Sequence, residues 1–239
     1  MIPLEEAQSH VLRNVSQLPS GGLALSSACS HVTAQAVTSK ELVPPFDNTA
    51  VDGYAVIAFN TLDASDSDEV QLEVIGSIAA GVDPDFELED GQCAKIMTGA
   101  PMPKGADAVV MVEWTSTNDV GDAVRISKSV KEGDHIRRSG EDLQVGDQVV
   151  GEGTFLTPAH IGLLAGIGVY QVNVVQRPVV GVFSTGDELV EGNKPLKPGQ
   201  IRDSNRFSLL ALLERDGFQT VDLGLIPDDK EAIESTVLE

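Results

Sequence analysis

The stretch PPFDNTAVDGYAV, residues 44–56, is the most informative part of this sequence. It opens on two prolines, continues with an aspartate, an asparagine and a threonine, and leads into the β-prone run YAVIA. Small polar side chains of this kind form turns by bonding to nearby backbone groups. Asp52 precedes Gly53, where the absence of a side chain lets another backbone segment approach closely. The stretch predicts a turn followed by a strand, and it leaves two roles open for Asp52: capping backbone amides, or facing a cation or ligand.

A long β-rich region surrounds this stretch, from about residue 51 to residue 155. Short runs of aliphatic and β-branched residues alternate there with turn signals, and they are YAVIA, VQLEVIGSI, QCAKIM, ADAVVMVEW, AVRISKSV and DQVVGEGTFL. The polar segment NDVGD, between Glu113 and Val124, is typical of a hairpin connection. This spacing predicts a β-rich module of small barrels or sheets.

Helices are expected on both sides of the β-rich region. Residues 3–16 carry apolar side chains at helical spacing, with a proline at the start and two glutamates in the first turn. ALSSACSHVTAQAV, residues 24–37, is expected to form a second helix. Residues 157–168 are expected to form a third, with Thr157 as its N-cap and Pro158 at its first position.

The C-terminal part, from Arg177 onward, alternates strands and helices. RPVVGVFSTGDEL and QTVDLGLI each contain an apolar run, which predicts two buried parallel strands. Between them Asp203, Ser204 or Asn205 can cap a helix with a leucine-rich face, and Gly217 can end it. DDKEAIESTVLE begins a second helix. This order is the opening of a doubly wound parallel sheet, and because such sheets are normally buried on both faces, two strands look like an unfinished domain.

The charge balance excludes some classes of partner. The chain has 37 acidic and 16 basic residues, for a formal net charge of −21. Such a field opposes nucleic acids and anionic membrane surfaces, because phosphate binding depends on lysine and arginine. No apolar run approaches the roughly 20 residues of a membrane span. We therefore expect no nucleic-acid or membrane partner, and an anionic substrate would need a divalent cation, a helix N-terminus or a few placed arginines.

Cysteine and histidine are sparse and scattered. Cys29 and Cys93 are the only cysteines, which gives neither a disulfide framework nor a metal knuckle. Two isolated thiols favour a reducing compartment, so we expect a cytoplasmic protein. The histidines lie far apart along the chain, and we expect no zinc site.

Two further turns inside the β-rich region collect hydroxyl and charged groups. In KIMTGAPMPKGAD, residues 95–107, Thr98 follows a strand; it either belongs to a rigid β-turn or offers a fixed hydroxyl to an oxyanion. In HIRRSGEDL, residues 135–143, Arg137 and Arg138 can clamp a phosphate or carboxylate, and Glu141 and Asp142 can bind a metal. The alternative is that Arg137 and Asp142 pair with each other.

A fourth turn, FSTGDEL at residues 183–189, follows the first predicted parallel strand. Ligands of open α/β sheets bind beyond the carboxyl ends of the strands. Ser184, Thr185 and Gly186 offer hydrogen-bond donors there, and Asp187 and Glu188 offer carboxylates. The position of this turn favours a binding function over a purely structural one.

Taken in order, PPFDNTAVDGYAV, KIMTGAPMPKGADAVVMVE, RRSGEDLQVGD and GVFSTGDEL resemble the molybdopterin molybdenumtransferases, a family that completes molybdenum-cofactor synthesis and includes the gephyrin E-domain. The likeness runs from about residue 3 to the end, with Thr49 and Val51 where serine and methionine are more usual. It implies a multidomain α+β fold with three parts. These are a discontinuous first (linker/dimer) domain at 1–43 and 144–175, an inserted β-rich domain at 44–143, and an incomplete α/β doubly wound molybdopterin-binding domain at 176–239.

The resemblance also implies a reaction and its residues. Family members insert molybdate into adenylylated molybdopterin and release AMP, with Mg²⁺ assisting. The matching positions are Asp52, Thr98, Asp142 and Glu188 as catalytic residues and Arg137, Thr185, Gly186 and Asp187 as substrate-binding residues. Asp52 and Asp142 are the implied magnesium ligands. The implied partners are a second copy of the chain, in a homodimer whose shared cleft contains Asp52, and a molybdopterin-adenylating protein upstream.

Parts of the family pattern are absent from this chain, namely turns of the SGGVS and GLPG type and a fourth, β-barrel domain. We therefore expect a fragment that ends within the third domain and cannot complete the transfer. A non-catalytic dimerisation or scaffold module of the same fold is the alternative function. Retention of all four catalytic positions favours the enzyme, because a scaffold does not need them. A sugar- or peptide-binding protein would need an aromatic groove, and this chain has only one tryptophan and two tyrosines.

Overall fold

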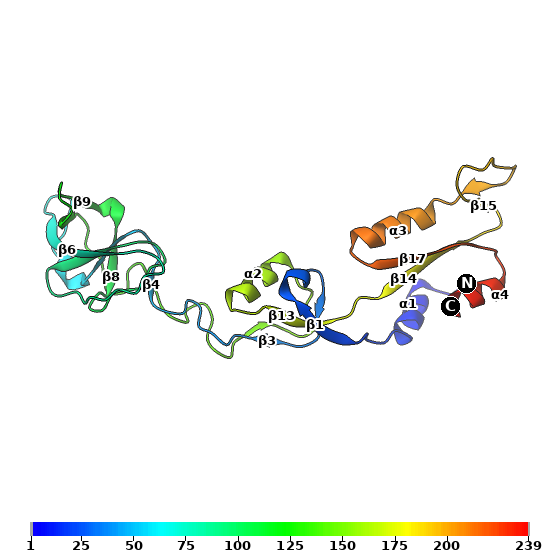
Figure 1. Cartoon of the computed structure of the whole chain (residues 1–239), viewed down its shortest axis with the longest axis horizontal. Helices are drawn as coiled ribbons and strands as arrows, with labels where there is room; N and C mark the ends of the chain where they lie inside the picture. Colours follow the sequence, from blue (N-terminus) through cyan, green and yellow to red (C-terminus); the bar gives the residue numbers. More distant parts are fainter. Residues whose placement is uncertain (1, 239) are drawn as a thin grey trace. The chain divides into compact units, whose positions relative to one another are not determined.

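The computed structural model describes residues 2–238, which divide into two compact units (Figure 1). We call them the outer unit (Met1–Gln35, Glu152–Ile161 and Tyr170–Glu239) and the inserted unit (Ala36–Gly151 and Gly162–Val169). The multidomain α+β fold class is confirmed. Along the chain, the β-rich inserted unit interrupts the outer unit, which contains both helices and strands. The finer division into three domains stays a prediction.

Among the described residues, the outer unit contains one three-stranded sheet, two two-stranded sheets and most of the helical residues. Its elements are α1 (Leu4–Arg13), β1 (Ser20–Ala24), η1 (Leu25–Ser27), β2 (Val32–Thr33), β13 (Gln171–Val175), β14 (Val179–Thr185), β15 (Leu189–Val190), β16 (Ile201–Arg202), α3 (Asn205–Arg215), β17 (Gln219–Ile226) and α4 (Lys230–Leu238). Three antiparallel strands form one sheet in the order β1-β13-β2, and β14 pairs with β17 in parallel. The helix α2 (Pro158–Gly166), whose residues are divided between the two units, begins at the proline, as predicted.

The pair β14 and β17 carries α3 along it, which confirms the predicted strand–helix–strand order (Figure 1). Gly217 follows α3 with a φ of +79°, and its N–H donates to the Glu214 carbonyl, as expected of the predicted C′ residue. The expectation that β17 is buried was wrong, since Ile226 is its only buried residue. Among residues 2–238 no third strand pairs with β14 or β17, so most residues of this two-stranded sheet are not buried.

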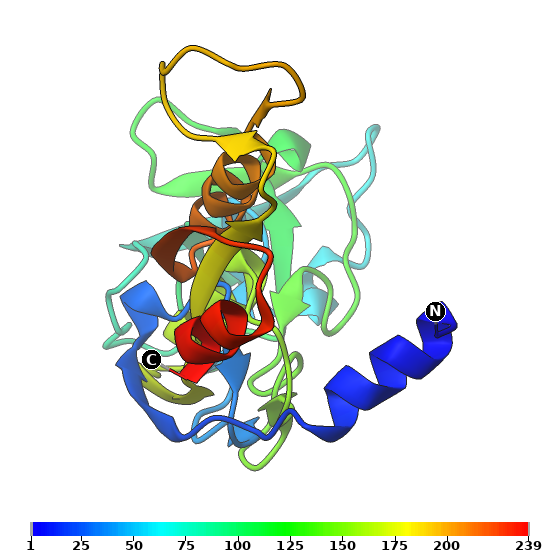
Figure 2. The same ribbon diagram turned by 90° about the vertical axis from the view of Figure 1, so that its right-hand side faces the viewer.

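The helices are short, and α1 is exposed on every side. It follows an extended Pro3 and runs from Leu4 to Arg13, a shorter range than the predicted one. None of its residues is buried, and it stands clear of the other elements of its unit in Figure 2. Among the described residues, no helix combines the length and apolar character needed to cross a membrane.

Residues 24–37 do not form the helix expected from the sequence. They form the single turn η1, the short strand β2 and the start of β3. The backbone of Val32 pairs with Val175 of β13. Serine, threonine and valine have modest helix preferences, so this strand pairing outweighs a weak local tendency.

The inserted unit consists mainly of strands. Its elements are β3 (Val37–Thr38), β4 (Asn48–Thr49), β5 (Gly53–Val56), η2 (Ala58–Thr61), β6 (Val70–Ile78), β7 (Gln92–Ile96), β8 (Ala108–Met111), η3 (Val112–Trp114), β9 (Thr115–Thr117), β10 (Ala123–Ile126), β11 (Ile136–Arg137) and β12 (Gln148–Val150). Six of them form a sheet in the order β8-β5-β7-β6-β10-β9. The β-prone runs lie in strands as predicted, and β9 and β10 form the hairpin expected around NDVGD.

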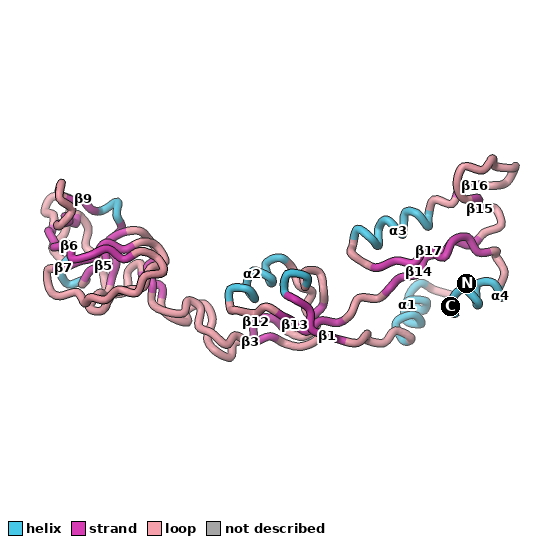
Figure 3. The backbone as a smooth tube through the Cα atoms, viewed as in Figure 1, coloured by secondary structure: helices cyan, strands magenta, loops and turns pink. Residues whose placement is uncertain are grey.

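Two long connections lead into and out of this sheet and pair with each other (Figure 3). Val43 and Leu143 exchange both backbone hydrogen bonds, at 2.9 and 3.1 Å. Farther from the sheet β3 pairs with β12. We call residues 37–43 and 143–150 the ribbon, because together they form one antiparallel path by which the chain enters and leaves the sheet.

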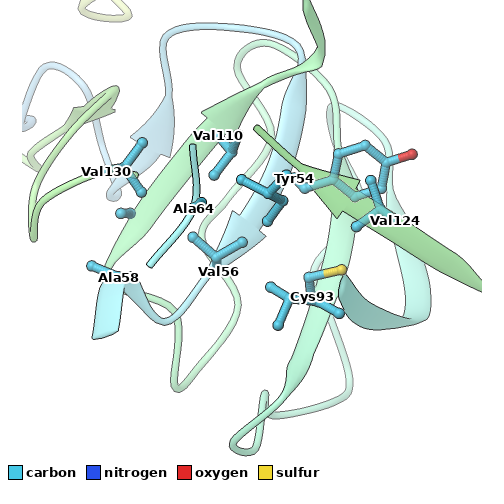
Figure 4. Packing of buried hydrophobic residues seen from close by; sticks show 11 residues of the cluster. Tyr54, Val56, Ala58, Ala64, Cys93, Val110, Val124 and Val130 are labelled. Carbon is cyan, nitrogen blue, oxygen red and sulfur yellow. The ribbon is translucent and has the colours of Figure 1, made fainter. Parts of the chain in front are cut away.

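Each face of the six-stranded sheet carries a buried apolar cluster. Side chains alternate along β5, so Tyr54 and Val56 belong to one apolar cluster while Ala55 belongs to a second. Figure 4 shows the first cluster, in which Val56, Cys93 and Val110 lie together. Burial raises the pKa of the Cys93 thiol to about 12, so this cysteine acts as a small core hydrophobe.

Gly53 begins β5 at a point where β8 comes very close. A Cβ atom at this position would lie 1.9 Å from the Val110 carbonyl oxygen. Only glycine fits there, which is the close backbone approach expected from the sequence. Because this close approach fixes the position of Gly53, the backbone position of Asp52, which directly precedes β5, is fixed as well.

Candidate functional site

Three of the four predicted turns meet in the inserted unit. β4, which belongs to PPFDNTAVDGYAV, pairs with β11, which belongs to HIRRSGEDL. The Thr49 N–H donates to the Ala100 carbonyl at 3.2 Å, and the Gly99 N–H donates to the Thr49 carbonyl at 2.9 Å, which joins the first turn to KIMTGAPMPKGAD. We call these segments the turn cluster: residues 44–54, 97–103 and 135–143.

Asp52 contacts Thr98 across the turn cluster. Its Oδ1 accepts hydrogen bonds from the Thr98 backbone N–H at 2.7 Å and from Thr98 Oγ1 at 2.8 Å. These two bonds, the backbone one first, hold the pKa of Asp52 below its ordinary value. Within residues 2–238 no hydrogen bond or ion pair engages Asp52 Oδ2, and the residue is exposed. One oxygen therefore caps an amide, and the other is available to a ligand.

Arg137 and Asp142 form an ion pair, which is the alternative that the sequence left open. Both side chains are about half exposed, at 46 % and 52 %. Among residues 2–238, no group of three or more His, Cys, Asp or Glu side chains is arranged to hold a metal. The structure brings Asp52 together with Thr98, and Arg137 together with Asp142.

The contacts that hold the turn cluster together were missed by sequence reasoning. Asp47 Oδ2 accepts from Arg138 Nη1 at 2.7 Å, and its Oδ1 accepts from the Ser139 N–H at 2.8 Å. The Ser139 bond and then the Arg138 bond lower the pKa of Asp47. Asp47 and Arg138 are 91 positions apart, so no local pattern pairs them. The only available signal was their opposite charge in two turn motifs.

The fourth predicted turn lies in the outer unit, directly after β14. Thr185 is the last residue of that strand and is paired with Ile226 of β17. Gly186 has a φ of +148°, and a Cβ atom on it would meet the Glu188 carboxylate at 2.6 Å. Thr185, Gly186, Asp187 and Glu188 therefore lie at the carboxyl edge of a parallel strand pair, as the sequence predicted.

The register of this strand pair adds a candidate residue. Asp228 and Asp229 follow the end of β17, at the same edge as the residues after Thr185. Asp229 Oδ1 accepts from the Ala232 N–H at 3.0 Å and so caps α4. Asp228 is exposed, and within residues 2–238 its carboxylate has no hydrogen bond. The signal was present in the sequence, since an acidic pair follows a predicted parallel strand.

The chain matches known families over nearly its whole length. Residues 2–168 match a family described as "MoeA N-terminal region (domain I and II)". The chain belongs to the MoeA family. Residues 181–239 of this MoeA-family chain match a second family, described as "Probable molybdopterin binding domain". The resemblance inferred from the four turn motifs is confirmed.

Individual relatives of this MoeA-family chain agree with that assignment. "Molybdopterin molybdenumtransferase" of Haemophilus influenzae is 40% identical over 242 residues, which cover 100% of this chain and 58% of the relative. The protein of the same name in Bacillus subtilis is 38% identical, with 95% and 54% covered. A solved structure of the molybdopterin biosynthesis moeA protein from Pyrococcus horikoshii OT3 is 32% identical, with a TM-score of 0.85, and covers 100% of this chain and 63% of that one. The chain thus spans somewhat more than half the length of these relatives.

Proposed function

We propose that this MoeA-family chain takes part in molybdenum-cofactor biosynthesis and supplies part of a site that inserts molybdate into adenylylated molybdopterin and releases AMP. The observation that carries the proposal is the contact between Asp52 and Thr98 in the turn cluster. It fixes a carboxylate with one unused oxygen among loops from three motifs, in a chain that matches the family at residues 2–168 and 181–239. AMP leaves as water adds across the phosphate–phosphate bond, and two dithiolene thiols bind molybdenum as one oxo group departs as water.

Asp52 and Thr98 act as one unit in this proposal. Thr98 supplies two donors to one oxygen, which fixes the direction of the carboxylate. Molybdate and phosphates are anions, so an unshielded carboxylate would repel them. Carboxylate oxygens are preferred ligands of Mg²⁺, which often takes only one or two from the protein and completes its shell with water and substrate phosphates. Asp52 Oδ2 fits such an ion, and Mg²⁺ there would offset the repulsion and draw charge from phosphate or oxo oxygens.

Arg137 and Asp142 would exchange partners when substrate binds. In the structure they neutralise each other. If Asp142 turned toward a cation, the Arg137 guanidinium would be released to donate to a phosphate or molybdate oxygen. Both side chains are about half exposed, so the exchange requires no burial of a lone charge.

The strand-end residues of the outer unit complete the proposal. Thr185 and Gly186 donate to the substrate, and Asp187 and Glu188 provide carboxylates at the edge where open α/β sheets bind ligands. We also propose a homodimer that receives its substrate from a molybdopterin-adenylating protein in the cytoplasm. Size-exclusion chromatography with light scattering tests the dimer.

AMP release tests the reaction. The protein is mixed with adenylylated molybdopterin, molybdate and Mg²⁺, and we expect AMP above the protein-free rate. Asp52→Asn keeps the acceptor for Thr98 but removes the charge, so we expect turnover to fall by at least about tenfold with little change in folding. Thr98→Ser keeps both donors and serves as the control. Unchanged AMP release and unchanged dimerisation in Asp52→Asn would contradict the proposed role of Asp52.

A further inference from the structure

Arg206 is the largest fully buried side chain of the molecule, although it carries a charge. It lies in the first turn of α3, and its side chain is 1% exposed. Its guanidinium donates to three carboxylates: Asp203 at 2.8 Å, Glu191 at 2.8 Å, and Asp222. Such a fork of donors is specific to arginine, because a lysine ammonium cannot span three fixed acceptors in one plane.

The first partner links Arg206 to the strand end that carries the proposed site. Asp203 has a fully buried carboxylate, which also accepts from Ser184 Oγ at 3.0 Å. Burial would raise the pKa of Asp203, but the bonds from Arg206 and Ser184 bring it below the ordinary value. Ser184 directly precedes Thr185, the last residue of β14. The Asp203–Arg206 pair therefore fixes the backbone at the end of this strand, just before the loop.

The second partner links Arg206 to the neighbouring strand. Asp222 also accepts from the Gly224 N–H at 2.9 Å. The register of the parallel pair shifts at this point, because Val182 faces Asp222 while Phe183 faces Gly224. One extra residue in a strand bends it and re-aims the residues that follow. Asp222 therefore ties Arg206 to the irregular part of β17.

The third partner, Glu191, links Arg206 to the loop between residues 189 and 202, which follows the strand-end residues Thr185–Glu188. Glu191 follows β15, which pairs with β16. The Ile201 N–H donates to the Glu188 carbonyl at 2.9 Å, so this loop is tied to the strand-end residues themselves. One guanidinium thus joins the end of β14, the irregular part of β17 and the loop from residue 189 to residue 202.

A purely stabilising role explains these contacts poorly. Burying a charge costs several kcal/mol, and well-packed apolar residues often replace buried ion pairs without loss of stability. Three carboxylates arranged around one cation serve to fix positions. They fix the two strand ends that lead to Thr185–Glu188 and to Asp228.

We propose that Arg206 is a positioning residue that sets the spacing between the loop after β14 and the loop after β17. This proposal rests on the proposed function for its effect on turnover, but not for its effect on the two loops. Arg206 is 1% exposed and its guanidinium bonds to three carboxylates, so it acts through these partners and not on the substrate directly.

Arg206→Lys tests the proposal with two independent readouts. Amide hydrogen exchange should quicken by about tenfold at residues 184–188 and 222–228, and less in the rest of α3 and β14. In the AMP-release assay kcat should fall by about tenfold or more while KM changes by less than about threefold, because the groups are misplaced rather than lost. Arg215→Lys is the matched control: it lies on the same helix, pairs with Asp216 and is exposed.

Two milder variants separate the arms of the network. Ser184→Ala should quicken exchange at residues 185–188 only, and Asp222→Asn at residues 224–228 only. These variants decide the question if Arg206→Lys does not fold. Exchange that rises evenly over the outer unit, or that stays unchanged at both loops, would overturn the proposal. If unaltered protein releases no AMP, the proposed function fails, and the exchange measurements still decide whether Arg206 positions the loops.

Discussion

At the scale of the residue, two aspartates of the motif PPFDNTAVDGYAV, Asp47 and Asp52, make different contacts. Asp47 uses both oxygens to hold Arg138 and Ser139, whereas Asp52 uses one oxygen and leaves the other unbonded by residues 2–238. The first is therefore suited to holding loops together and the second to meeting a ligand. Both roles depend on an ionised carboxylate, so both are sensitive to acid.

Asp47→Asn should lower stability at neutral pH and lose that effect in acid. The folded-state pKa of Asp47 is depressed, so its contribution is present above the unfolded value of about 3.9 and disappears as pH falls through the folded value. We expect the unfolding midpoint to drop by about 2–4 °C at pH 7, with the gap closing as the pH falls below the unfolded value. Thermal unfolding from pH 7 to pH 2.5 measures it. Asp119→Asn, on the exposed hairpin loop, should shift the midpoint by less than about 1 °C; a gap for Asp47→Asn that widens in acid would contradict the assignment.

Gly53→Ala should strongly destabilise the inserted unit. The new methyl group would lie 1.9 Å from the Val110 carbonyl oxygen, so β5 and β8 must separate. We expect a loss of about 3 kcal/mol in the free energy of unfolding, measured by urea denaturation. Gly21→Ala is the control, because nothing lies within 4 Å of its added Cβ. Equal losses in the two variants would show that the contact with Val110 is not the cause.

At the scale of the element, a buried hydroxyl joins the 3-10 helix η2 to a distant loop. Thr61 is 0% exposed; its Oγ1 donates to the Ala58 carbonyl at 2.9 Å and accepts from the Val130 N–H at 3.0 Å. One side chain thus ends η2 and holds the segment that leads toward β11. This link closes one side of the apolar cluster shown in Figure 4.

Thr61→Val should cost about 1–3 kcal/mol in the free energy of unfolding, because the shape is kept while the buried Val130 N–H loses its acceptor. Thr61→Ser keeps the hydroxyl and should cost less than half as much. Chemical denaturation of both variants gives the comparison. A serine variant as unstable as the valine variant would mean that the lost methyl contact, and not the hydrogen bond, matters.

The sequence predicted strands, turns and the strand–helix–strand order well, because each has a local pattern. It placed Asp52, Thr98 and Glu188 in turns, but it could not tell that Asp52 bonds to Thr98, 46 positions away. It missed Arg206, which looks like an ordinary helix residue until its three partners are brought together by the fold. It also failed at residues 24–37, where long-range strand pairing outweighs local preference.

At the scale of the whole molecule, the chain passes to and from the six-stranded sheet by the ribbon alone. Val43 and Leu143 form a hydrogen-bonded pair of the kind that flanks a two-residue hairpin loop. Replacing residues 44–142 by Asn-Gly should therefore close the ribbon without strain. We expect the shortened chain to unfold cooperatively, as followed by circular dichroism and size-exclusion chromatography. Joining Val43 to Gln144 through the same dipeptide shifts the register by one residue and should fold less well; if both fold equally, the pairing does not govern closure.

This closure at Val43 and Leu143 also suggests how such an architecture could arise. A hairpin tip is where a chain tolerates added sequence best, since no core residue is displaced. The segment 44–142 can be regarded as a hairpin turn enlarged into a folding unit of its own. On that view Asp52 and Thr98 belong to the added segment and not to the scaffold, because both lie between Val43 and Leu143 in the chain.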